Sequence, residues 1–154
     1  MKDLSAQLHI KEQLIQACKN QLAERKAVIK KHLDDIMQAL QSETKSTAGD
    51  KHETGRAMLQ IERENSGRQL AEIEKQEHIV NRIQLSKQER VALGAVVITD
   101  KHNYFISIPI DKLSINAEYY PIGLGSPIGQ LLLGKQQGEA IQFRGTLFTI
   151  KNVY

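Results

Sequence analysis

Two acidic side chains, Asp50 and Glu53, stand three residues apart in a polar stretch of the chain. If a helix begins here, both carboxylates lie on one face, because residues three apart on a helix are neighbours. One interpretation is structural: Asp50 as N-cap with Glu53 at the third helical position forms a variant of the capping box. The other is chemical: two carboxylates bind Mg²⁺ weakly and leave its other coordination positions to water or to another molecule. One carboxylate can serve both purposes, so both interpretations stay open.

The rest of the sequence contains no pattern typical of a self-contained active site. The five histidines are dispersed, and no Cys/His set has the spacing of a zinc site. The single cysteine, Cys18, lies on an apolar stripe, where a buried and unreactive thiol is expected. The glycine-rich stretch at 123–129 lacks the Lys-Ser/Thr of a phosphate-binding loop. The sequence therefore predicts a protein that is not itself an enzyme and has no cofactor of its own.

Charge and hydropathy narrow the classes of partner. The 154 residues include 21 basic and 18 acidic side chains, a net charge of +3. This excess is too small and too scattered to favour direct, sequence-specific binding of nucleic acid through counterion release. No run approaches the ~20 apolar residues of a membrane span, and the first residues lack the apolar core of a signal peptide. We expect a cytoplasmic protein with a protein partner and no contact with a membrane.

Composition divides the chain into two parts. All aromatic residues and all three prolines lie after residue 103, whereas the first 88 residues are rich in Gln, Glu, Lys, Leu and Ile. The composition of the first 88 residues is typical of long helices. We therefore predict a helical domain at residues 1–88 and a second domain at 89–154.

Apolar residues in the first part recur every seven positions, the period of a coiled-coil seam. One helix carries this repeat at five positions, and a second helix, from about 51 to 85, carries it at four: Leu8, Ile15, Leu22, Ile29 and Ile36, then Leu59, Ser66, Ile73 and Val80. Leu4, Cys18, Leu33 and Leu40 widen the first stripe. The polar stretch 42–50 would form the turn. The pattern predicts an antiparallel helical hairpin with its tip at about 43–53, and self-association through the same seam stays an alternative.

The second part alternates short apolar runs with turn residues. It predicts strands at 95–99, 104–110, 119–122, 140–144 and 147–153. A short helix is predicted at 126–134, with Ser126 as N-cap, Pro127 as first residue and Gly134 as C-terminal stop. The fold class is therefore α+β: a coiled-coil hairpin followed by a small β-rich domain with one short helix.

Two segments resemble motifs of the GreA/GreB transcript-cleavage factors. The stretch from Ser126-Pro127 to Glu139 has the Ser-Pro, small apolar helix and Gly-Lys-x-x-Gly-acid order of that family's C-terminal signature. The stretch Gly49-Asp50-Lys51-His52-Glu53 is similar to its tip, Gly-Asp-Leu-x-Glu. On the basis of these two motifs, the chain is identified as a divergent member of that family.

The resemblance implies a fold and a function. It implies an FKBP-like C-terminal domain that binds RNA polymerase, and a coiled coil that enters the secondary channel of the polymerase. There Asp50 and Glu53 would help to hold Mg²⁺, shared with the polymerase, while the polymerase cleaves its own backtracked RNA. The resemblance also implies the partner-binding residues Ser126, Pro127, Lys135 and Gly138.

The tip departs from the family pattern, and this keeps other functions open. Lys51 and Arg56 place positive charge beside the two acids, which opposes Mg²⁺ binding. One alternative is a secondary-channel regulator of the polymerase that does not stimulate cleavage. Others are a coiled-coil adaptor or oligomerisation protein and, from the FKBP-like fold alone, a prolyl isomerase, which would need an aromatic-lined pocket.

Overall fold

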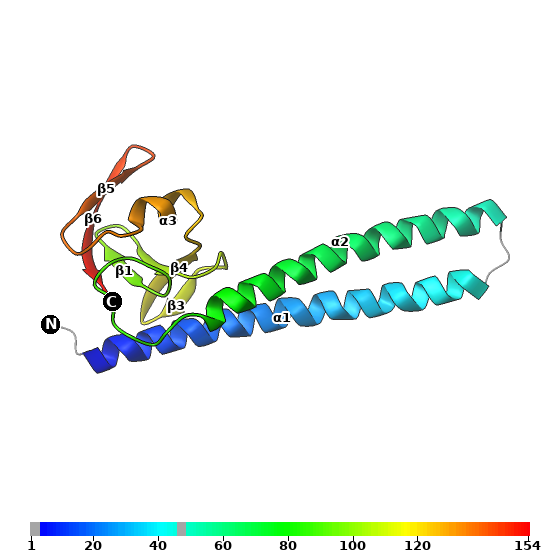
Figure 1. Cartoon of the computed structure of the whole chain (residues 1–154), viewed down its shortest axis with the longest axis horizontal. Helices are drawn as coiled ribbons and strands as arrows, with labels where there is room; N and C mark the ends of the chain where they lie inside the picture. The colour runs from blue at the N-terminus through cyan, green and yellow to red at the C-terminus, as the bar shows by residue number, and fades with distance from the viewer. Residues whose placement is uncertain (1–3, 46–48) are drawn as a thin grey trace. The chain divides into compact units, whose positions relative to one another are not determined.

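The computed structural model describes residues 4–45 and 49–154, and the side chains of residues 43–52 lie outside the described part. Two long helices come first, α1 (Leu4–Lys45) and α2 (Gly49–Asn81), and a six-stranded sheet with one short helix follows (Figure 1). The predicted α+β class, a helical hairpin followed by a β-rich domain with one short helix, is confirmed. We call the part from the first to the last strand, residues 96–153, the β domain.

The chain divides into two compact units. One contains Met1–Gln21 together with His78–Tyr154, and the other is the outer part of the hairpin, Leu22–Glu77. The base of each long helix therefore belongs to the unit that contains the β domain. The boundary predicted after residue 88 was drawn from composition and stays a prediction.

The turn predicted at residues 42–50 is too long. Helix α1 continues through Lys45, and α2 already includes Gly49 and Asp50. Residues 42–45 are polar, but polar side chains are accepted in an exposed helix, and extending a helix that is already formed takes little free energy. Asp50 accordingly lies inside the first turn of α2 and not before it. Helix α2 ends at Asn81, before the predicted end at about 85.

The heptad pattern is confirmed at most seam positions in the outer part of the hairpin, although Ile29, Leu33 and Leu59 are only half-buried. Leu22, Ile36 and Leu40 of α1 are buried, and so are Ser66 and Ile73 of α2. At 1.5 Å per residue the two helices are about 63 and 50 Å long. Because Ser66 occupies a seam position that a large apolar residue would otherwise fill, the middle of the seam has little apolar volume.

At the base of α1 the buried face differs from the predicted one. The buried residues there include Ile10 and Leu14, whereas Leu4, predicted to widen the seam, is 47% exposed. The reason is a second packing partner: Cys18 Sγ lies 3.9 Å from Ser107 Oγ, which follows a strand of the β domain. Cys18 is buried as predicted, and burial raises the pKa of its thiol to about 11, which keeps it protonated and unreactive.

The sheet has the order β3-β4-β2-β1-β6-β5, in which β2 and β4 run parallel and all other neighbours antiparallel. The strands are β1 (Val96–Thr99), β2 (Asn103–Ile106), β3 (Leu113–Ile115), β4 (Ala117–Ile122), β5 (Ala140–Phe143) and β6 (Thr146–Val153). The strand predicted to reach residue 110 ends at Ile106, since Pro109 cannot donate a ladder hydrogen bond. β3 was not predicted.

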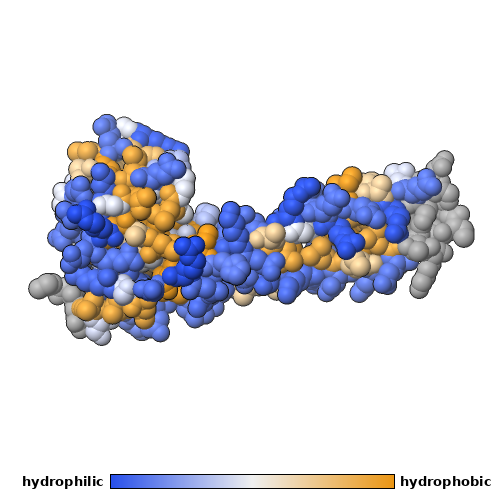
Figure 2. Space-filling view, in the orientation of Figure 1, coloured by the Kyte–Doolittle hydropathy of each residue, from blue (hydrophilic) through white to orange (hydrophobic). Residues whose placement is uncertain are grey.

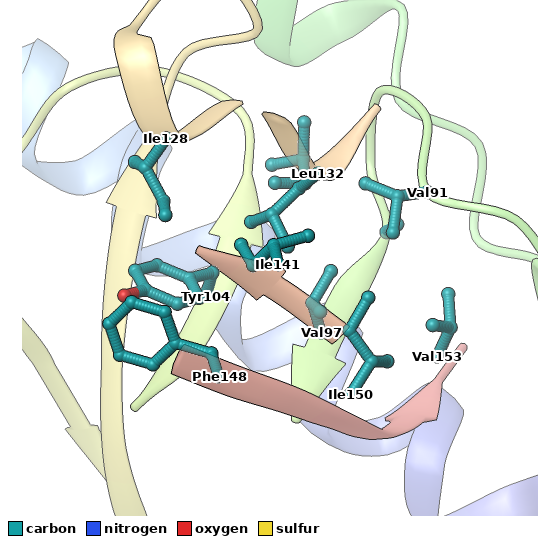
Figure 3. Close-up of a cluster of buried hydrophobic side chains, with 11 residues drawn as sticks. Val91, Val97, Tyr104, Ile128, Leu132, Ile141, Phe148, Ile150 and Val153 are labelled. Atoms are coloured by element: carbon teal, nitrogen blue, oxygen red, sulfur yellow. The ribbon is translucent and has the colours of Figure 1, made fainter. Parts of the chain in front are cut away.

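A core of apolar side chains lies between the sheet and α3 (Pro127–Leu132). Figure 3 shows side chains from α3 and from four strands pointing toward one another: Ile128, Leu132, Val97, Tyr104, Ile141, Phe148 and Ile150. The opposite face of β1 and β2 is buried as well, through Val96 and Phe105. Burial on both faces explains why β1 begins with three consecutive apolar residues, Val96 to Ile98, instead of alternating.

Lys11, at the base of α1, is fully buried, and its Nζ donates to the backbone carbonyl of Ser86 at 2.7 Å. Among the described residues it forms no ion pair with a carboxylate. Burial lowers the pKa of Lys11 to about 8, because the charged form is poorly solvated. Between pH 8 and 10.5 the unfolded chain thus binds more protons than the folded one, and this difference makes stability rise with pH.

We expect Lys11→Met to stabilise the protein at pH 7 by about 2 kcal/mol, because it removes a buried ammonium and keeps the apolar stem. The gain should shrink as pH rises from 8 and vanish near pH 10.5, where the lysine is neutral in both states. Urea unfolding at several pH values measures it, and Lys19→Met, at an exposed position of the same helix, is the control. A loss of stability of the variant at pH 7 would contradict the predicted stabilisation.

Candidate functional site

The first candidate site is the start of α2. Asp50 and Glu53 are its second and fifth residues, and the helical backbone from Gly49 onward places residues three apart on one face. The Glu53 side chain is exposed, whereas the side chains of Asp50 and Lys51 lie outside the described part. Acidic groups are favourable here, because the amide groups at the start of a helix carry partial positive charge. The predicted pairing of the two carboxylates stays a prediction.

Arg56, one turn further along, has a structural contact that the sequence did not predict. Its Nη1 donates to the backbone carbonyl of Leu40 on α1 at 3.3 Å. The guanidinium therefore links the two helices close to the end of the hairpin. Its positive charge stays near the first turn of α2, as the sequence predicted.

The two acids can supply only part of a metal site. In the described part of the chain, no group of three or more His, Cys, Asp or Glu side chains is placed to hold a metal ion. Mg²⁺ takes six oxygen ligands in octahedral geometry and often keeps several waters. Two carboxylates at the end of a hairpin fit this ion only when another molecule completes its coordination.

The second candidate site is the segment 126–139 of the β domain, beginning with the cap of α3. Ser126 Oγ accepts a hydrogen bond from the Gly129 N–H at 3.1 Å and donates one to the Gly123 carbonyl at 2.8 Å. Pro127 is the first helical residue. The predicted N-cap is confirmed, so the hydroxyl of Ser126 is used within the chain.

The turn after α3 is held by backbone hydrogen bonds. Gly134 donates to the carbonyl of Val91 at 2.8 Å, and Val91 donates to that of Lys135 at 2.8 Å. Gly138 has φ of +94°, a conformation that favours glycine, and donates to the Ile150 carbonyl at 2.8 Å. The Glu139 carboxylate accepts a hydrogen bond from the Gln136 N–H at 2.7 Å. The Gly-Lys-x-x-Gly-acid motif thus builds a turn.

The four predicted partner-binding residues therefore lie in one segment, and two of them have a structural role within the chain. Ser126 caps α3 and Gly138 permits the turn, whereas Pro127 is exposed and Lys135 is half-buried. Asp50 and Glu53 belong to the other compact unit.

The structure also identifies two exposed apolar side chains that the sequence analysis did not single out. Leu131 is 39% and Leu133 is 51% exposed, whereas Leu132 between them is fully buried. The signal was present in the sequence: three consecutive leucines at the end of a short helix point in different directions, so they cannot all face the core. These two side chains give the α3 surface an apolar character that a partner can bury.

The aromatic side chains that an isomerase pocket would need are largely used in packing. Tyr104 and Phe148 are each only 7% exposed and belong to the core. Burial raises the pKa of the Tyr104 hydroxyl, and the neighbouring Tyr120 raises it further. His102 lies edge-on to Tyr120, with ring centres 5.1 Å apart. Tyr104 therefore acts as a core residue with a covered ring.

Comparison with known proteins adds little. No protein-family model matches the chain, and no curated protein matches it either. Among solved structures it is similar to the structure of the transcription factor Gfh1, with 17% sequence identity over 88% of this chain and 92% of that chain, and a TM-score of 0.35. A score this low establishes neither a shared family nor a shared function. In the described part of the chain, no helix is sufficiently long and apolar to span a membrane.

Proposed function

We propose that this chain is a Gre-like transcription elongation factor. It binds RNA polymerase through the β domain, inserts the hairpin into the secondary channel, and stimulates cleavage of backtracked RNA. The observation that carries the proposal is the position of Asp50 and Glu53, among the first five residues of α2, which directly follows α1 in the hairpin. The hairpin can present both acids to a site deep within a partner, because its helices are about 50 Å long or longer.

The chain's own contribution is positional. In cleavage the Mg²⁺ of the polymerase supplies the positive charge that stabilises phosphodiester hydrolysis. Asp50 and Glu53 would complete the surroundings of that ion, and their carboxylates can orient and accept a proton from a nearby water. All bond breaking belongs to the polymerase, so the factor alone is not an enzyme. Such a protein works in the cytoplasm, beside the polymerase.

The β domain supplies the docking surface in this proposal. Ser126 and Gly138 fix the backbone on either side of α3, and Leu131 and Leu133 project from the surface between them. Exposed apolar side chains on a rigid helix are suitable anchors for a protein partner. Pro127 and Lys135 flank these leucines in the sequence and would contact the same partner.

A second candidate function is a channel-binding regulator that does not stimulate cleavage. The observation that favours it is the position of Arg56, whose guanidinium lies one turn from Glu53 and is held by the Leu40 carbonyl. A fixed positive charge this close to the acids opposes cation binding. Docking through α3 would be the same in both cases.

The docking surface is tested by binding of the chain to the RNA polymerase of its host. We expect the double variant Leu131→Glu/Leu133→Glu to bind at least about tenfold more weakly, because two charges would be buried at the interface. Leu147→Glu is the matched control, since Leu147 is an exposed leucine of β6 in the same domain, and it should bind like wild type.

Two results would overturn the docking proposal. If wild type shows no binding to the polymerase, the function proposed above is wrong, and a coiled-coil adaptor is left. If wild type binds and the double variant binds equally well, the polymerase is held by another surface.

A further inference from the structure

The outer part of the hairpin, Leu22–Glu77, has an open groove along one side of its seam. The groove has a volume of about 580 Å³ and lies between the walls formed by α1 and α2. Its apolar lining consists of Val28, Ile29 and Ile73. Val28 is 68% exposed, an unusual position for a branched apolar side chain on a long helix. On the face seen in Figure 2, apolar surface lies between polar side chains along the hairpin.

The groove is open because its side of the seam is polar. Arg25, Gln69 and Gln76 stand at lining positions that a regular coiled coil would fill with apolar residues. On the opposite side, Lys26 and Glu77 close the hairpin with an ion pair of 3.0 Å. At this level of the hairpin the two sides are thus unequal: the groove is open on one side, and the ion pair spans the two helices on the other.

The charges on the groove walls are opposite and come from different helices. Arg25 projects from the α1 wall and Glu72 from the α2 wall. Within the described residues, neither forms an ion pair or side-chain hydrogen bond. A two-fold axis parallel to the helices exchanges the two walls, so it would bring each Arg25 beside the Glu72 of the other copy. Such self-complementarity is the requirement for an isologous dimer.

We propose that a second copy of this chain covers the groove, so that two hairpins form an antiparallel four-helix bundle. In this arrangement α1 of each copy lies over α2 of the other, and neighbouring helices run in opposite directions, as in many four-helix bundles. Val28, Ile29 and Ile73 of both copies are buried between the two Arg25–Glu72 pairs. An unrelated partner would not require opposite charges at places that a two-fold axis relates.

The size of this face sets the expected strength. Helix α1 from Leu22 to Lys45 is about 36 Å long, and two helices side by side are about 20 Å wide. Contact along this whole length would cover at most about 700 Å² on each copy, less than the ~800 Å² of a standard interface, and the groove lining itself spans only residues 24–29 and 69–76. Because part of the face is polar, we expect a reversible dimer that dissociates on dilution. The dimer does not depend on the proposed function, since it needs only this chain.

Sedimentation equilibrium of the full chain tests the proposal, with charge reversals at the two walls. Wild type should show a concentration-dependent monomer–dimer equilibrium. Arg25→Glu alone and Glu72→Arg alone should each weaken association by about tenfold or more, since each places like charges together twice. The double variant Arg25→Glu/Glu72→Arg should associate again to within about threefold of wild type. Lys75→Glu, at an exposed α2 position outside the groove lining, is the control and should behave like wild type.

Each alternative result decides against the dimer. Wild type that stays monomeric at every concentration overturns it, and the groove is then open to a different protein. Association that persists in both single variants, or that the double variant fails to recover, places any self-contact elsewhere. Helical circular dichroism of every variant confirms that the hairpin is intact.

Discussion

Gly129→Ala is expected to destabilise the β domain by about 3 kcal/mol. Gly129 is buried in α3, and a β-carbon there would overlap the backbone carbonyl oxygen of Gly123 and lie 2.9 Å from Ser126 Oγ. Both atoms belong to the cap of α3, where the Gly123 oxygen accepts from the Ser126 hydroxyl at 2.8 Å. The new methyl group would therefore have to displace the backbone and separate the helix from its cap.

A neighbouring glycine provides a matched control for this substitution. Gly125 has no atom within 4 Å of the position that a β-carbon would occupy, so Gly125→Ala should change stability by less than about 0.5 kcal/mol. All four tyrosines lie after residue 103, so tyrosine fluorescence during urea unfolding reports on the β domain. A Gly129→Ala variant as stable as wild type would show that the turn at Gly123 relaxes freely.

The hairpin shows which part of a long helix can be predicted from its pattern. In the outer part, the seven-residue repeat identified buried positions such as Ile36 and Ile73, because each helix has one partner there. At the base the repeat was only partly right: Cys18 and Val80 are buried as predicted, but Ile10 and Leu14 are buried as well, since α1 also packs against residues near Ser107, about 90 positions away in the sequence. The apolar pattern of one helix gives no information about such a second packing partner.

In the β domain as well, the features set by neighbouring residues were predicted, and those set by distant residues were not. The N-cap at Ser126 and the two strands at 140–144 and 147–153 were predicted, because the hydrogen bonds of the cap and the positive φ of Gly145 between the strands are set by neighbouring residues. The parallel pairing of β2 with β4 was not predicted, because β3 separates the two strands in the sequence. β3 itself has three residues and only one of them, Leu113, is buried, so its pattern is too short to recognise.

The candidate sites were predicted to different extents. The sequence placed Asp50 and Glu53 three apart near the start of a helix, which the backbone of α2 confirms. It missed that Arg56 reaches the Leu40 carbonyl, a contact that depends on how α1 and α2 pack. It also missed that Leu131 and Leu133 stay exposed, since which of three leucines faces the core depends on the sheet beneath.

The largest functional effect is expected at the start of α2. The double variant Asp50→Asn/Glu53→Gln removes two negative charges and preserves the size of both side chains. Helix α2 should still form, because asparagine and glutamine differ little from aspartate and glutamate in helix propensity. If the carboxylates act beside the Mg²⁺ of the polymerase, stimulation of RNA cleavage should fall by about 100-fold or more. Docking should be unchanged, since the β domain is untouched.

The most direct measurement is RNA cleavage in stalled, backtracked elongation complexes of the host polymerase with Mg²⁺, with polymerase binding followed in parallel. A control variant, Glu62→Gln/Glu74→Gln, makes the same change of charge at exposed positions further along α2. The account predicts that wild type and the control bind and accelerate cleavage, and that Asp50→Asn/Glu53→Gln binds equally well without accelerating it. Full acceleration by that variant would contradict the role of the acids, and failure of wild type to bind would contradict the polymerase as partner.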